Sequence, residues 1–318
     1  MKEIQLQFLE RLSKLLGPSK LLATELEGCL GISKSQAYNK MSGKTMLSIE
    51  EILLLCEKYG LHFTIDKLNN RTVAPVSFMP FRGGRFSVEQ YLVSLENFLY
   101  QIASAKQKKL TCATDDIPIF HLFKYPEIAA FKLYFWNARL GKNQPFLFDH
   151  KMIDTGISAS AAHLHQLYQS IPTVEIWTKS SLYNTMEQLR YAVEAKIITD
   201  KGLGQLICAQ LRSTLKDIEN YAVSHEKQNG ILFEWYFYDI IGCITYFAET
   251  DGSENAFLRF NTFNTMQVEK GPLCDEVKFW LDSVIQDSTG FSGHGRLQRN
   301  RFLEEAYSSC NELEELFL

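Results

Sequence analysis

The sequence lacks the patterns that mark membrane and secreted proteins. No apolar run approaches the length of about 18 residues that a transmembrane helix requires. The first residues form an amphipathic pattern that carries Glu3 and Glu10, whereas a secretory signal begins with a basic stretch before an apolar core. We therefore expect a cytoplasmic protein that makes no contact with a membrane.

Patterns of paired cysteines and the common catalytic motifs are also missing. Seven cysteines are scattered singly along the chain and form no C-x-x-C pair, which argues against a disulfide framework and a zinc ribbon. The sequence contains no H-E-x-x-H, no P-loop, no G-x-S-x-G and no G-x-G-x-x-G after a strand. We expect reduced thiols, no metal, no cofactor and no catalytic site, and hence a protein that is not an enzyme.

The chain has no excess of basic residues. Its 33 Lys and Arg residues are outnumbered by 37 Asp and Glu residues, which gives a net charge of −4. A protein that binds nucleic acid through its overall field is strongly basic. This composition leaves only a local basic patch for such contact.

What the sequence does contain is a short helical segment followed by a longer mixed one. Residues 1–66 show four short helical patterns, two of which open with a capping box, Ser33 with Gln36 and Ser48 with Glu51. Residues 67–86 hold two prolines, two glycines and no period, as a linker does. We predict an all-α helix-turn-helix domain over 1–66, a linker over 67–86 and a second domain over 87–318.

The second domain has patterns of both kinds of secondary structure. The stretch KKLTCAT is typical of a strand, and residues 230–263 are rich in β-branched and aromatic side chains, which favours two or three further, neighbouring strands. Long helical patterns lie between them, and two more, around 273–286 and 295–316, finish the chain. These patterns predict a larger mixed α/β or α+β domain.

The stretch LGISKSQAYNKMSG has the features of a DNA-reading helix. Apolar side chains stand where a second and a third helix pack together, and Gly31 provides the turn between them. From residue 33 to residue 49 there are three lysines and no acidic residue. Six polar side chains of the third helix and its end suit phosphates and base edges, and we predict that they bind DNA: Lys34, Ser35, Gln36, Asn39, Lys40 and Lys44.

Residues 26–43 follow the pattern L-x-x-x-L-G-I-S-x-x-x-x-Y-x-x-x-S-G, which resembles the lambda-repressor-like (XRE-type) helix-turn-helix family. The resemblance covers about residues 4–66 and implies binding of double-stranded operator DNA, usually as a homodimer, with the third helix in the major groove. Glu27 departs from the pattern, since the family often has Ala there. A carboxylate at this position either faces solvent or repels a nearby phosphate. Residues 1–70 carry nine Lys and Arg against eight Asp and Glu, so a helical bundle used only for protein contact is the alternative.

The second domain resembles the C-terminal regions of uncharacterised helix-turn-helix regulators from Bacteroidetes, on the residues DDIPIFHLFKYPEIAAFKLYFW and IPTVEIW. That resemblance implies a regulator and supplies no activity. The glycine-rich stretch STGFSGHGRLQRNRF, residues 288–302, leads into a helix with arginines, and such a helix start favours anions. We predict a site for a small anionic effector at Ser292, Gly293, Arg296 and Arg299. The alternative is a loop whose arginines pair with the acidic tail, residues 304–315.

Three further features have two interpretations each. Asp115 and Asp116 follow a strand, where paired carboxylates either do acid–base work or bind a cation, or else cap a helix. His163 and His165 lie two apart in a helical pattern, so their side chains point to different faces and do not suit a shared metal. The abundant aromatic residues either line an effector pocket or form core: Phe131, Tyr134, Phe135, Trp136, Trp177, Trp235, Tyr236 and Phe237.

Together these patterns favour a one-component transcriptional regulator. The first domain reads DNA, and the second dimerises, senses a small ligand, or both. One alternative is an enzyme carried on a DNA-targeting module, with Asp115, Asp116 and the 288–301 loop as its parts. Another is an interaction scaffold that has no affinity for DNA.

Overall fold

The computed structural model describes residues 2–16, 21–59, 61, 67–68, 71–72, 74–78, 87–138, 147–149, 151, 154–260 and 264–317. Its internal contacts divide the chain into a small unit, Met1–Pro75, and a large unit, Val76–Leu318. The division falls inside the segment that we predict as a linker.

The small unit contains four helices in its described part: α1 (Lys2–Leu16), α2 (Leu22–Leu30), α3 (Lys34–Met41) and α4 (Ile49–Tyr59). Apolar side chains from all four meet in one core, in which Leu12, Leu26, Ala37 and Leu55 are completely buried. Burying such a side chain contributes roughly 1.5–3 kcal/mol, which holds together helices too short to be stable alone.

Both predicted capping boxes are confirmed. The Ser33 hydroxyl accepts a hydrogen bond from the Gln36 backbone N–H, and the Gln36 side chain accepts one from the Ser33 N–H. The Ser48 and Glu51 side chains exchange the same pair of bonds at the start of α4. Each box fixes where its helix begins by satisfying N–H groups that have no partner within the helix.

The described part of the predicted linker contains short β structure. β1 (Lys67–Leu68) pairs with β2 (Arg71–Thr72) in an antiparallel ladder. Ser77, just beyond the division, belongs to the large unit, where it pairs with Gln267 through two backbone hydrogen bonds of 3.0 and 2.8 Å. Short β structure therefore lies within the segment 67–86 that we predict as a linker, of which residues 69–70, 73 and 79–86 lie outside the described residues.

The large unit is a mixed α/β structure built on a seven-stranded sheet in the order β8-β7-β6-β3-β4-β5-β9. Strands β3, β4 and β5 are parallel, and the remaining neighbours are antiparallel. The strands are β3 (Lys108–Thr114), β4 (Thr173–Trp177), β5 (Phe233–Phe237), β6 (Thr245–Thr250), β7 (Ser253–Arg259), β8 (Thr265–Glu269) and β9 (Thr289–Gly290).

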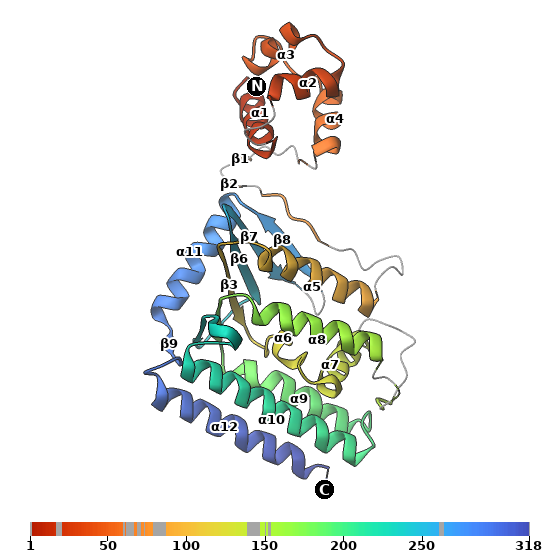
Figure 1. Ribbon diagram of the computed structural model, residues 1–318, viewed down its shortest axis with the longest axis vertical. Coiled ribbons are helices and arrows are strands. Elements are labelled where there is room, and N and C mark those ends of the chain that lie inside the picture. Colours follow the sequence, from red (N-terminus) through yellow and green to blue (C-terminus); the bar gives the residue numbers. More distant parts are fainter. Residues whose placement is uncertain are drawn as a thin grey trace. The chain divides into compact units, whose positions relative to one another are not determined.

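Most helices of the large unit cover one face of this sheet, and α11 (Pro272–Asp287) covers the other (Figure 1). The larger core lies under the first group, and a smaller core lies beneath α11. The first group consists of α5 (Val88–Ala103), α6 (Ile119–Leu122), α7 (Pro126–Ala138), α8 (Thr155–Gln169), α9 (Ser180–Glu194), α10 (Lys201–Ser224) and α12 (Arg296–Glu315).

Several predicted elements are confirmed, and three strands of the sheet are missing from the prediction. The KKLTCAT strand is β3, the last two helical patterns are α11 and α12, and residues 230–263 supply β5, β6 and β7. Only β6 and β7 of these are neighbours, because β3 and β4 lie between β5 and β6, so the expectation of neighbouring strands is wrong for β5. Strands β4, β8 and β9 were not predicted, although β4 pairs with the central strand β3. None of the described helices has the length and apolar character that a membrane span requires.

Candidate functional site

The region that the sequence assigns to DNA is the surface of α3. Gly31 ends α2 with a φ of 65°, in the left-handed region that favours glycine, and the chain turns into α3 within three residues. Ala37 is buried against α2, while Lys34, Ser35 and Gln36 are exposed. The helix therefore presents its polar face, and the positive end of its dipole, to solvent.

The six predicted DNA-binding residues differ in exposure. Lys34, Ser35, Gln36 and Lys44 are exposed, and Asn39 and Lys40 are half-buried. Sequence reasoning overlooked Tyr38, which is 53% exposed between them. A single exposed aromatic residue is common on protein surfaces, so only its place among the polar residues of α3 marks Tyr38 as a candidate contact.

Two of these residues also make bonds inside the small unit. The Gln36 carbonyl is engaged in the capping box. The Lys40 ammonium lies 2.8 Å from a Glu51 carboxylate oxygen and 3.0 Å from the Met46 carbonyl, with only 12% of its side chain exposed. Burial alone would raise the pKa of Glu51, but the bonds from Lys40 and the Ser48 backbone outweigh it and lower the pKa. Lys40 thus joins α3 to α4.

A buried glutamine fixes the end of α3. Gln5, 4% exposed, donates its amide hydrogens to the carbonyls of Lys40 (2.7 Å) and Thr45 (2.9 Å) and accepts from the Leu47 N–H (2.7 Å). Three bonds from one side chain tie α1 to the turn that follows α3. This turn carries Lys44, so its position relative to α3 is set by the packing of the unit.

The predicted anion site around residues 292–299 has a different geometry. The Gly293 N–H donates to the Ala222 carbonyl (3.0 Å), and the Ser292 hydroxyl accepts from the Trp235 N–H (2.9 Å). Arg299 is 4% exposed and donates to the Phe291 and Gly293 carbonyls, whereas Arg296 is exposed. The two guanidinium groups do not share a face, and the loop's polar groups bond to the fold itself.

The alternative for these arginines also differs from the structure. Residues of the acidic tail pair with basic side chains of other helices: Glu305 with Lys179 (3.1 Å) and Glu314 with Arg212 (2.7 Å). Arg299 instead holds the loop that precedes its own helix. The geometry favours a structural role for this loop, and anion binding there stays a prediction.

A cavity of about 520 Å³ opens in the large unit between α5 and the sheet. Its floor consists of alternate residues of β6, β7 and β8, which point to the same face because side chains alternate along a strand. The carboxyl end of β3 closes one end, which is where α/β proteins bind ligands. The floor residues are Tyr246, Phe257, Arg259, Thr265 and Gln267.

A buried ion pair stands at the closed end of the cavity. Asp116 accepts hydrogen bonds from Lys132 (2.8 Å), Thr185 (2.7 Å) and its neighbour Ile117 (2.9 Å). Lys132 is completely buried, and burial lowers its pKa although the pairing with Asp116 opposes this. The interpretation of Asp116 as a helix cap is wrong. Pro118 holds the N-cap position of α6, and no side chain makes a capping hydrogen bond to that helix.

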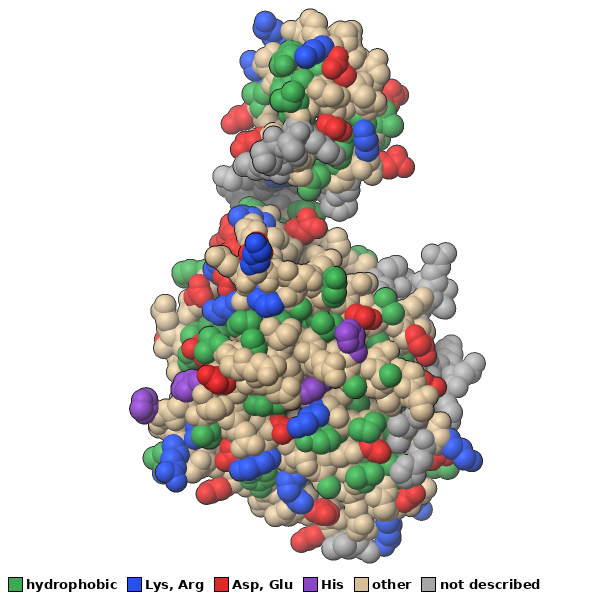
Figure 2. All heavy atoms as spheres, viewed as in Figure 1, with side chains coloured by type: hydrophobic (Ala, Val, Ile, Leu, Met, Phe, Trp, Pro, Cys, Tyr) green, Lys and Arg blue, Asp and Glu red, His purple; other side chains and the backbone are tan. Residues whose placement is uncertain are grey.

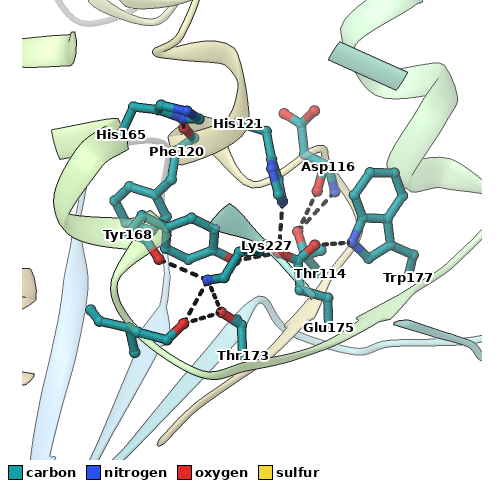
Figure 3. Close-up of polar contacts among 11 residues, drawn as sticks. Thr114, Asp116, Phe120, His121, His165, Tyr168, Thr173, Glu175, Trp177 and Lys227 are labelled. Atoms are coloured by element: carbon teal, nitrogen blue, oxygen red, sulfur yellow. Dashed lines mark hydrogen bonds and ion pairs between the residues drawn. The ribbon is translucent and has the colours of Figure 1, made fainter. Parts of the chain in front are cut away.

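Next to the cavity lies a polar network centred on Glu175, a fully buried residue of β4 (Figure 3). Its carboxylate accepts bonds from His121 (2.7 Å), Trp177 (2.8 Å) and Tyr168. Burial raises the pKa of a carboxyl group, but here these partners outweigh it and lower the pKa of Glu175. Three partners make a buried charge tolerable in the middle of a sheet.

Lys227 completes this network from the loop after α10. It is 5% exposed, and its ammonium donates to the carbonyls of Tyr168 (2.7 Å) and Ile171 (2.6 Å) and to the Thr173 hydroxyl, as Figure 3 shows. It also lies 4.1 Å above the Tyr168 ring. These contacts join α8, the start of β4 and the loop before β5.

Cross-strand pairing places the network and the cavity in one row. The pairs run from Gln267 to Phe257, then Tyr246, then Cys112, and finally Glu175. The first three line the cavity, and the last is the network's centre. The sequence signal that could have predicted β4, and with it the position of Glu175, is the run TVEIW, since β-branched and aromatic residues are typical of a strand.

The remaining candidates are resolved by burial. His163 is exposed and His165 is buried, so their predicted separation onto two faces is confirmed. Phe131, Trp177 and Trp235 are core residues with no exposed surface, and Trp136 alone among the eight named aromatics lines the 520 Å³ cavity. The core interpretation therefore holds for most of them.

The structure does not assemble the parts of the alternative enzyme. Asp115 and Asp116 follow β3, whereas the 288–301 loop lies beside β5 and β9, with β4 between. Burial raises the pKa of Asp115, and the neighbouring Asp116 adds to this. On the face of the large unit seen in Figure 2, acidic and basic side chains are interspersed.

These two regions, the polar face of α3 and the cavity with its buried ion pair, are the candidate functional sites. No family model, no curated protein and no solved structure matches the chain.

Proposed function

We propose that this protein is a DNA-binding transcriptional regulator whose small unit reads DNA with α3. The observation that carries the proposal is the local geometry of α2, Gly31 and α3. A left-handed glycine and a capping box fix the turn, and the next helix exposes Lys34 and Ser35 at its positive end. Helix-turn-helix proteins place such a face in the major groove, with phosphates near the helix start.

The contacts described above refine the roles of the predicted residues. Lys34 and Lys44 are exposed cations and suit phosphates. Gln36 and Asn39 carry the amide groups that suit base edges, although Gln36 also takes part in the capping box and Asn39 is half-buried. We assign base reading to these two amides and to the exposed Tyr38. Lys40 serves mainly to join α3 to α4.

We assign to the large unit the pairing of two chains, which a single helix-turn-helix needs for useful affinity. One helix-turn-helix contacts a half-site of a few base pairs, so useful affinity requires two copies on DNA. We assign dimerisation, or sensing of a small ligand, or both, to the large unit. The mixed charge on its visible face supports leaving DNA contact to the small unit (Figure 2).

The test is salt-dependent binding of the full chain to duplex DNA chosen from a random pool. We expect the affinity to fall steeply with salt, and Lys34→Ala and Lys44→Ala each to reduce the salt slope by about one. Lys58→Ala is the matched control, since it removes the same charge from α4, where Lys58 lies 3.8 Å from Glu25.

Absence of any salt-dependent binding would refute the proposal and favour a protein-interaction scaffold. An equal loss in Lys58→Ala and Lys34→Ala would refute the assignment of α3, because it would show that only net charge matters.

A further inference from the structure

The cavity of about 520 Å³ is the feature of the large unit that DNA binding does not use. Small-molecule sites usually occupy roughly 300–1,000 Å³. The lining comes from α5, the ends of β3 and α7, the sheet, and the segment Ser77–Phe78, all within the large unit.

The walls of the cavity are rich in aromatic rings. Tyr246 and Phe257 lie side by side on neighbouring strands of the cavity floor, and Phe98 of α5 packs on Phe257 with ring centroids 4.5 Å apart. Trp136 and Phe120 line the end near β3. Flat, weakly polar walls favour a planar ring, because stacking on an aromatic side chain does not depend on the exact ring.

Carboxamides provide the polar part of the lining. Asn97 and Gln101 stand four residues apart on α5, and Gln267 lies opposite on β8. Each carboxamide has both a donor and an acceptor. The edges of purine and pyrimidine rings carry donors and acceptors side by side, and Asn and Gln pair with such edges.

The charges near the cavity balance one another. Asp116 is paired with Lys132 at 2.8 Å, and the Arg259 guanidinium lies 5.0 Å from the centre of the Trp136 ring. Asp115 lies close enough to Arg259 for the arginine to lower its pKa against the stronger effect of burial. With two acidic and two basic side chains, this region lacks the concentrated positive charge that binds phosphate groups.

We propose that this cavity binds an uncharged nucleoside, with the base held between the aromatic walls and its edge bonded to the carboxamides of α5 and β8. The role of the nucleoside as an effector of DNA binding rests on the proposed function. The existence of the nucleoside site in the cavity does not. Ser77, which lines the cavity and pairs with Gln267, follows Pro75 by two residues, so a bound ligand contacts the first residues of the large unit.

The experiment is titration calorimetry of the full chain with adenosine, guanosine, cytidine and uridine, each compared with its 5′-monophosphate. We expect at least one nucleoside to bind, and its monophosphate to bind at least tenfold more weakly. Gln101→Ala should weaken the binding about three- to tenfold by removing one ligand bond. Gln166→Ala, an exposed glutamine of α8 outside the cavity, is the matched control and should leave binding unchanged.

Three results would overturn the proposal: no heat with any nucleoside at millimolar concentration, equal affinity for the monophosphate, or equal effects of the two glutamine variants. A gel shift on the same preparation separates this outcome from failure of the proposed function. DNA binding without nucleoside binding removes the site alone, and nucleoside binding without DNA binding removes the regulator alone.

Discussion

The two units use basic side chains in opposite ways. In the small unit, Lys34 and Lys44 are exposed on α3 and on the turn after it. In the large unit, Lys132, Lys227 and Arg299 are buried, and each donates to oxygens of the fold. The same residue types thus include charges exposed to solvent on α3 of the small unit and charges that hold elements together in the large unit.

The difference shows what decides the role of a lysine or arginine. The long apolar stem allows burial wherever the charged head reaches enough acceptors. Lys227 finds three such oxygens, two of them carbonyls near the junction of α8 and β4. Arg299, beside the glycines of the 288–295 loop, likewise donates to the carbonyls of Phe291 and Gly293.

The largest expected effect that tests this comparison belongs to Lys227. Lys227→Met removes the donor that the Tyr168 and Ile171 carbonyls share, and leaving them unsatisfied costs about 3 kcal/mol of the free energy of unfolding. Urea unfolding measures this. Lys216→Met makes the same change at an exposed position of α10, where the side chain pairs with Glu219, and should cost less than about 0.5 kcal/mol. Equal losses would erase the distinction between buried and exposed lysines.

A second effect of Lys227 depends on pH. Burial lowers the pKa of Lys227 to about 7, against 10.5 in the unfolded chain. Between these values the unfolded state binds more protons, so the stability of the parent rises with pH, by at most about 1.4 kcal/mol per pH unit.

The parent and Lys227→Met should therefore diverge by roughly 2 kcal/mol between pH 7 and pH 9 in urea unfolding. A difference between the two proteins that stays constant over this range would show that Lys227 keeps its charge in the native state.

Arg299 provides a smaller test within the large unit. Arg299→Ala leaves the Phe291 and Gly293 carbonyls without their donor and should cost roughly 1.5 kcal/mol, with no change in DNA affinity. Arg296→Ala, on the exposed side of α12, should change neither quantity. Melting temperatures with and without millimolar phosphate provide the measurement. Stabilisation of the parent by phosphate that both variants lose would instead restore the anion site.

The smallest expected effect concerns Lys40, which lies between the two classes. Lys40→Ala should lower the stability of the small unit by roughly 0.5–1 kcal/mol through loss of the Glu51 pair. The lowered pKa of Glu51 means that this contribution is present near neutral pH and is lost as the pH falls through that value. Thermal unfolding at pH 7 and pH 3 measures it. If Lys40→Ala weakens DNA binding without lowering the stability, Lys40 contacts DNA as we propose for Lys34, and its role in joining α3 to α4 is wrong.

Local signals in the sequence predicted the local structure well. The capping boxes at Ser33 and Ser48 and the strand before Asp115 follow from neighbours within a few residues. The burial of Glu175 does not, because its partners His121 and Tyr168 come from other elements. A carboxylate in a five-residue strand gives no sign of its burial until those partners are placed.

The candidate sites show the same limit. The face of α3 was predictable because a helix shows its periodicity in its own residues. The cavity needs α5 and three antiparallel strands to come together, and the order of strands in a sheet is not written in any one segment. The loop at Ser292 stays open to both interpretations, because its glycines fit an anion site and a close backbone approach equally well.

The loop at residues 288–293 has a consequence for self-association. Unpaired strand edges invite pairing with another chain and lead to aggregation. Along β5, the N–H groups of Phe233 and Trp235 already donate to His225 and Ser292, and β9 pairs with the last two residues of the strand. At the opposite edge Ser77 occupies the middle of β8. The loop therefore covers the edge at β5, and one bridge interrupts the edge at β8, which disfavours the joining of two sheets along these edges.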